Sequence, residues 1–216
     1  MTMMKNYWGF TSWLYRLLMW VIFPTVALGT ILWAWVSSDS DVVVIPTILC
    51  LVIAPIIDVM SDVWLLPGFY VKGNSSLEFL QSTTKFSTMI RDVVVVDIIK
   101  RVVFYVGTYA LLFVVCANKE ASAKEFIEVY GYQPVLNILV VQIAVFIARF
   151  FGSVQQVFGI AMFSSVPNAI YILLVKPLPM EIERIYVIGM AVLSVVVIAV
   201  TIWFSLKKVR DSFYDQ

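Results

Sequence analysis

The sequence contains no histidine among its 216 residues, and this absence removes several kinds of chemistry. Histidine triads, zinc sites of the HExxH type and histidine proton relays all need an imidazole group. Phosphate-binding patterns are missing as well, because neither GxxxxGK[ST] nor GxGxxG occurs. We therefore expect no catalytic residues, no metal site and no nucleotide site, and the chain is not predicted to be an enzyme.

Cysteine and charge are also scarce. The two cysteines, Cys50 and Cys116, lie in separate apolar runs, which favours free buried thiols over a disulfide framework or a metal site. Charged residues make up 13% of the chain, whereas a soluble domain carries about 25%. The net charge of +1 gives no reason to expect a nucleic-acid partner.

Apolar residues dominate instead, at 62% of the sequence with a mean hydropathy of +0.95. Soluble domains contain about 45–50% apolar residues, so the expected surroundings are a lipid bilayer. Spanning backbone must satisfy its own hydrogen bonds, and the apolar runs do not alternate as barrel strands do. We predict an all-α integral membrane protein with one transmembrane domain over residues 1–216. Its six predicted spans cover residues 17–36, 42–66, 93–117, 135–151, 157–176 and 185–206.

The segment before the first span mixes aromatic residues with Lys5 and Arg16. No small-residue cleavage site follows, so an N-terminal interfacial helix is favoured over a signal peptide. Aromatic side chains concentrate at membrane interfaces, and we expect four of them near the headgroups. These are Tyr7, Trp8, Trp13 and Tyr15.

Lysine and arginine placement predicts the orientation. The side that holds both termini and the 61–101 loop carries eleven of these residues, against four on the other side. Positive loops stay inside the cell. We therefore expect a multi-pass protein of the cell membrane (inner or plasma) with cytoplasmic N- and C-termini.

Charged residues within the spans are costly and point to a site. Asp58 and Asp62 are four residues apart, and Asp97 precedes Lys100 and Arg101 by three and four, so each set shares a helix face. The second and third spans are expected to be neighbours, which predicts a cytoplasmic-side charge cluster. It comprises Asp58, Asp62, Arg91, Asp97, Lys100 and Arg101. Such a cluster either pins the helices together, which its position near the interface favours, or acts as an ion relay or gate.

Polar residues inside the later spans offer a second candidate. Ser164, Ser165 and Asn168 surround Pro167 in the fifth span, where they could break the helix and face a substrate path. The alternatives are an ordinary proline kink and small polar residues that join helices. Asn137 and Gln142 in the fourth span are interpreted as interhelical hydrogen bonds rather than ligands.

The longest polar stretch lies between the second and third spans. A Gly73-Asn74 turn precedes Ser75 and Glu78, which form the S-x-x-E pattern of a capping box, so a helix should begin near Ser76. Apolar residues recur over 77–90 at spacings of three, four and seven. The helix either lies on the headgroups or docks into a groove of a cytoplasmic partner.

The stretch LEFLQSTTKFSTMIRDVVVVDIIKRVVF resembles the loop between the second and third spans of ABC-2 type exporter permeases. That family has the pattern leu-glu-x-leu-x-ser-(thr/ser)-pro. Its residues here are Leu77, Glu78, Leu80, Ser82 and Thr83, with Thr84 in place of the proline. The resemblance implies that residues 75–90 form a coupling helix that docks on a separate ABC ATPase. The implied docking residues are Leu77, Glu78, Phe79, Leu80, Ser82 and Thr83.

The resemblance further implies a permease subunit of an ATP-driven exporter, working as a homodimer or as a heterodimer with a paralogous permease. ATP would be bound by the partner subunit, so the chain needs no cofactor of its own. Two other functions stay open at this point. One is an ion-coupled transporter or channel that uses Asp58, Asp62 and Asp97; the other is a non-transporting immunity or assembly factor.

Overall fold

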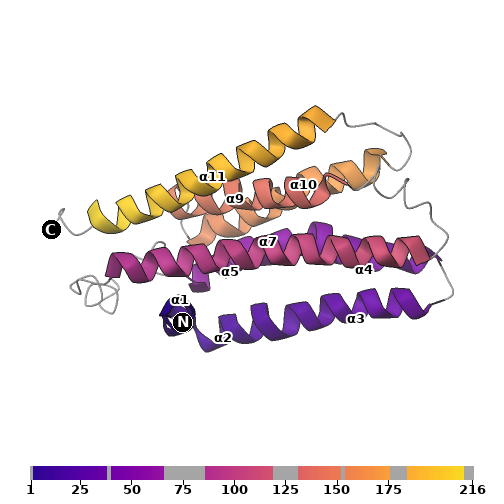
Figure 1. Cartoon of the computed structure of the whole chain (residues 1–216), viewed down its shortest axis with the longest axis horizontal. Coiled ribbons are helices and arrows are strands. Elements are labelled where there is room, and N and C mark those ends of the chain that lie inside the picture. Colours follow the sequence, from indigo (N-terminus) through magenta and orange to yellow (C-terminus); the bar gives the residue numbers. More distant parts are fainter. Residues whose placement is uncertain are drawn as a thin grey trace.

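The computed structural model describes residues 2–37, 40–65, 86–118, 131–151, 154–175 and 184–211 of the chain. Every secondary-structure element within these ranges is a helix, and the long helices run side by side as a bundle (Figure 1). The prediction of an all-α fold is confirmed for this part of the chain.

The N-terminal part of the chain folds into two short helices and a longer one. A tight turn joins the first two: Ser12 Oγ accepts a hydrogen bond from the Tyr15 amide (3.1 Å), and Arg16 Nη2 donates to the carbonyl of Thr11 (2.7 Å). These bonds satisfy backbone groups that helix ends otherwise leave unpaired. The elements are α1 (Thr2–Phe10), α2 (Trp13–Arg16), the π-helical segment η1 (Leu17–Ile22) and α3 (Phe23–Val36).

The second membrane-length segment is also built from several helical pieces. They are η2 (Ser40–Val43), α4 (Val44–Ile48), the π-helical segment η3 (Leu49–Ile53) and α5 (Ala54–Leu65). In both segments a π turn comes directly before a proline, Pro24 in α3 and Pro55 in α5. Proline removes one backbone donor and crowds the preceding turn, which a wider π turn relieves.

Four long helices complete the bundle. They are α7 (Phe86–Asn118), α9 (Gln133–Phe151), α10 (Val154–Val175) and α11 (Arg184–Asp211). The 33 residues of α7 would extend about 50 Å, which exceeds the roughly 30 Å hydrocarbon core of a bilayer. Pro167 lies inside α10, and the helix continues through it, so the break expected around residues 164–168 does not occur.

Five helical segments are long and apolar enough to cross a membrane. They are Trp13–Val36, Val44–Leu65, Thr88–Ala117, Gln133–Phe150 and Ile185–Lys207. They correspond to five of the six predicted spans. The first and third begin a few residues earlier than predicted, because each helix continues back through more polar residues.

Helices α5, α7 and α9 carry the candidate functional site. Helix α5 packs on α9 and α10, and α7 packs on α1, α3, α9 and α11. In Figure 1, α3 and α11 lie at opposite edges of the bundle. In α11, only 11% of the apolar membrane-length stretch is buried inside the bundle, against 56% in α9. Helix α11 therefore presents most of its side chains to the surroundings. Helix α1, the beginning of α7 and the end of α11 lie at the same end of the bundle (Figure 1).

Candidate functional site: a buried ion network

Two aspartates on α5 begin the site. Asp58 and Asp62 are one turn apart on the buried face of the helix, with 5% and 0% of their surface exposed. An ionised carboxylate in such a place needs partners, because an unpaired buried charge is strongly destabilising.

Helix α7 supplies a third carboxylate and two cations. Lys100 Nζ lies 2.9 Å from Asp97 Oδ1, and Arg101 Nη2 lies 2.6 Å from Asp97 Oδ2. The spacings of three and four residues place the three side chains on one helix face, as the sequence predicts.

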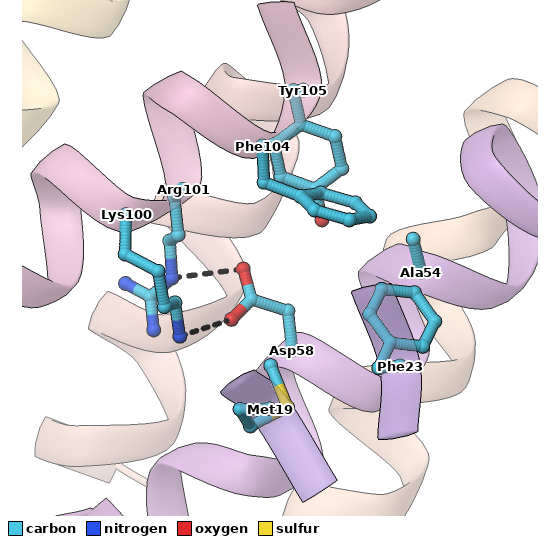
Figure 2. Close-up of a pocket in the computed structure, with 8 residues that line it drawn as sticks. All are labelled: Met19, Phe23, Ala54, Asp58, Lys100, Arg101, Phe104 and Tyr105. Carbon is cyan, nitrogen blue, oxygen red and sulfur yellow. Dashed lines mark hydrogen bonds and ion pairs between the residues drawn. The ribbon is translucent and has the colours of Figure 1, made fainter. Parts of the chain in front are cut away.

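The two cations of α7 also reach across to α5. Arg101 Nε donates to Asp58 Oδ2 at 2.9 Å, and Arg101 Nη2 lies 3.4 Å from Asp62 Oδ1. Lys100 Nζ lies 3.4 Å from Asp58 Oδ1 (Figure 2). Arginine and lysine therefore bridge two helices through one shared set of carboxylates.

Arg149 on α9 is the member that the sequence reasoning missed. It forms a two-pronged pair with Asp62, with Nε at 2.8 Å from Oδ2 and Nη2 at 2.5 Å from Oδ1. Parallel bonds from one guanidinium to one carboxylate are among the strongest ion pairs in proteins. A signal was present in the sequence, because Arg149 follows Gln142 by seven residues and so shares its buried face.

Among the residues that the structure describes, the network is balanced in charge. Its three carboxylates are Asp58, Asp62 and Asp97, and its three cations are Lys100, Arg101 and Arg149. Each aspartate has at least two cations within 4 Å. Such pairing is what makes charged groups tolerable inside an apolar bundle.

Aromatic residues of the N-terminal helices complete the network. Tyr15 donates to Asp97 Oδ1 at 3.1 Å and accepts from Lys100 Nζ at 2.8 Å. Tyr7 donates to Tyr15 at 3.0 Å and accepts from Trp20 Nε1 at 3.3 Å. Both tyrosines are fully buried among the helices rather than exposed on the surface of the bundle. Trp13, by contrast, is 72% exposed.

The buried position of Tyr7 changes its acidity. Burial is the largest effect and raises the pKa of the hydroxyl above its ordinary value of 10.0, while Lys100 lowers it and Asp97 raises it further. The hydroxyl therefore stays protonated at neutral pH and can donate to Tyr15.

Arg91 does not join the network. Its side chain is 54% exposed, and Nη2 lies 3.4 Å from Asp92 Oδ1 on the same helix. Asp92 is buried and accepts a 2.7 Å hydrogen bond from Asn6 of α1. This pair forms a second link between α1 and α7, which the sequence reasoning did not identify.

The polar residues proposed for a substrate path lie along α10. Ser164 and Ser165 are buried, and their hydroxyls donate to carbonyls of their own helix, at Ala161 and Met162. The side chain of Asn168 lies outside the described residues. Asn137 and Gln142 are both fully buried on α9. The six docking residues implied by the resemblance, between 77 and 83, also lie outside the described part.

A pocket borders the network between η1–α3, α5 and α7 (Figure 2). The space between its atoms is about 270 Å³, part of it open to the outside. Within the described ranges, no three histidine, cysteine, aspartate or glutamate residues are arranged to hold a metal ion. Both cysteines are free and buried.

No protein-family model, curated protein or solved structure matches this chain. Any function must therefore be argued from the residues themselves.

Proposed function

We propose that this chain is the membrane-embedded permease subunit of an ATP-driven exporter of the ABC-2 type. The single observation that carries the proposal is the ion network, because it ties α5, α7 and α9 together on the half of the bundle nearest the predicted coupling segment. Helix α7 begins at Phe86 and continues unbroken to Asn118, so its first turn overlaps the end of the 75–90 region. Movement of a docked segment would pass into α7 and, through the network, into α5 and α9.

The balanced charge of the network favours this role over an ion relay. A relay needs a carboxylate that gains and loses protons or cations during each cycle. Here each of the three carboxylates is already paired with cations at ion-pair distances. A fixed, neutral set of pairs suits a mechanical connection between helices.

Six spans and cytoplasmic termini are part of the same proposal. Helix α10 has 22 residues, which is enough to cross a bilayer, and it lies where the fifth span is expected. Of the eleven lysines and arginines assigned to the cytoplasmic side, Lys100, Arg101 and Arg149 are occupied in the network. The remaining eight still outnumber the four on the other side, which favours the same orientation. The subunit would sit in the cell membrane beside a second permease copy or a paralogue.

The docking claim is tested by purifying the chain from its native membrane and measuring ATP hydrolysis in the eluate. We expect an ATPase with a GxxxxGK[ST] loop to co-purify with the wild-type chain. Glu78→Arg and Leu80→Asp should abolish co-purification, because they alter the docking face while membrane insertion stays intact. Asn74→Arg introduces an arginine in the turn before the predicted helix and serves as the control.

Two results would contradict the proposal. The first is a wild-type chain that brings down no ATP-hydrolysing protein. The second is normal recovery of the ATPase with both Glu78→Arg and Leu80→Asp. Substrate export that depends on a proton gradient, with no ATPase required, would instead favour the ion-coupled transporter.

A further inference from the structure

The turn between α1 and α2 holds an arginine that faces no carboxylate among the residues that the structure describes. Arg16 Nε donates to the hydroxyl and the carbonyl of Thr11 at 3.0 and 3.1 Å, and Nη2 donates to the carbonyls of Thr11 and Trp8. All of these acceptors are neutral, and Nη1 makes no hydrogen bond to any described residue. The side chain is half-buried rather than enclosed. Its Nη1 edge is therefore left for an acceptor from outside the chain.

Lys5 adds a second cation to this surface. Its side chain is exposed and precedes Trp8 by three residues, so the two share one face of α1. The guanidinium of Arg16 lies over the Trp8 ring, 5.4 Å from its centre. Trp8 therefore connects the two cations and helps to hold Arg16 in place.

No acidic residue of the N-terminal helices balances these charges, because residues 2–16 contain neither aspartate nor glutamate. Two acids of α7 contact this part of the chain, but both are buried and already bonded. Asp92 accepts from Asn6, and Asp97 accepts from Tyr15. The surface formed by Lys5 and Arg16 therefore carries an excess of positive charge.

Apolar side chains are exposed directly beside the two cations. Trp13 is 72% exposed and Leu14 is 51% exposed, and the first membrane-length segment begins at Trp13. Arg16 is three residues inside that segment, or about 4.5 Å along the helix axis. Basic and aromatic side chains at the end of a span lie at the level of the lipid headgroups. Phosphate is the anion at that level, and guanidinium groups bind it well.

We propose that Lys5 and Arg16 bind the headgroup phosphate of an anionic phospholipid, with Trp13 and Leu14 against its acyl chains. Arg16 supplies the open Nη1 edge, and Lys5 supplies the second charge. A soluble phosphate could use the cations but would gain nothing from the exposed apolar side chains. The proposed orientation places this surface in the cytoplasmic leaflet, where anionic lipids create a negative surface potential. The lipid would bind to α1, which packs on α7, whatever the chain transports.

Native mass spectrometry of the full chain, titrated in detergent micelles with phosphatidylglycerol or phosphatidylcholine, tests this inference. We expect the wild-type chain to bind phosphatidylglycerol several-fold more tightly than phosphatidylcholine. Lys5→Gln and Arg16→Gln should each weaken phosphatidylglycerol binding about fivefold, because each removes one charge beside the headgroup. Arg91→Gln is the control, since that arginine is also exposed but lies 3.4 Å from Asp92. It should leave the preference between the two lipids unchanged.

Lys5→Gln separates lipid binding from folding, because Lys5 makes no described contact, whereas Arg16→Gln also removes the bonds to Trp8 and Thr11. Equal affinity of the wild-type chain for the two lipids would overturn the inference. So would an unchanged preference in Lys5→Gln, or an equal loss in Arg91→Gln. Inorganic phosphate at the same concentration should not displace the lipid, and displacement would show a soluble anion to be the occupant instead.

Discussion

Arg149 illustrates how a single side chain holds the network together. Its guanidinium forms two bonds to Asp62 and brings a third helix into contact with the pairs that join α5 and α7. Asp62 is fully buried, so its carboxylate contacts these partners rather than solvent. Removing one member of a buried pair costs about 3–5 kcal/mol, because the remaining charge is left unpaired.

Arg149→Gln is therefore expected to destabilise the chain by about 3–5 kcal/mol. The double variant Arg149→Gln/Asp62→Asn restores the charge balance and should regain a large part of the lost stability. The measurement is thermal or denaturant unfolding of the purified protein in detergent micelles. Arg91→Gln is the matched control, because that arginine is half-exposed and should change stability by less than about 1 kcal/mol.

Equal stability of the Arg149→Gln and Arg91→Gln proteins would contradict the structural importance of the pair. A double variant less stable than Arg149→Gln alone would show that the charges do not act as one neutral set.

Helix periodicity alone was enough to bring five of the network residues onto common faces. Asp58 and Asp62, and likewise Asp97 with Lys100 and Arg101, sit at spacings that share a face. The same geometry explains why Arg91 lies apart from the network. Arg91 precedes Asp97 by six residues, which places its side chain roughly 120° around the helix from that of Asp97. The pairing of Asp62 with Arg149 could not be predicted this way, since 87 residues separate them and only tertiary packing joins them.

Helix α1 is attached to α7 by polar contacts as well as by packing. Asn6 donates to Asp92, and Tyr7 donates to Tyr15, which in turn contacts Asp97 and Lys100. The sequence predicted an interfacial helix here, with its aromatic residues near the headgroups. Within the bundle, Tyr7 and Tyr15 find hydrogen-bond partners, which is the usual condition for burying that side chain.

Tyr7→Phe is expected to loosen α1. The change keeps the ring and removes a hydroxyl that makes two hydrogen bonds, for a net loss of about 1 kcal/mol. Such a loss should speed amide hydrogen exchange in residues 2–10 by about fivefold. Hydrogen exchange read by mass spectrometry measures this directly, and exchange in α9 should stay as it is in the wild-type chain.

Trp13→Phe provides the comparison, because Trp13 is 72% exposed and makes none of these bonds. If both substitutions change exchange in α1 to the same extent, the hydroxyl network does not hold this helix.

Whole-chain architecture was the most predictable property, because apolar runs of spanning length leave few other folds. Five predicted spans coincide with membrane-length helices. The π turns within the first two spans could not be predicted from hydropathy, because they arise from the local geometry around Pro24 and Pro55. Which helices become neighbours was also inaccessible, apart from the expected pairing of the second and third spans.

The number of crossings can be decided by where the two chain ends lie. Six spans place both ends on one side of the membrane, whereas five, without α10, place them on opposite sides. We expect a fluorescent protein fused after Gln216 or before Met1 to fluoresce, as it does only in the cytoplasm. Alkaline phosphatase inserted after residue 121, between α7 and α9, should be active, because the proposed arrangement places that position in the other compartment. An active phosphatase fused after Gln216, together with a fluorescent N-terminal fusion, would show that α10 does not cross. The charge distribution favours the six-span result, since eight lysines and arginines outside the network then share the cytoplasmic side.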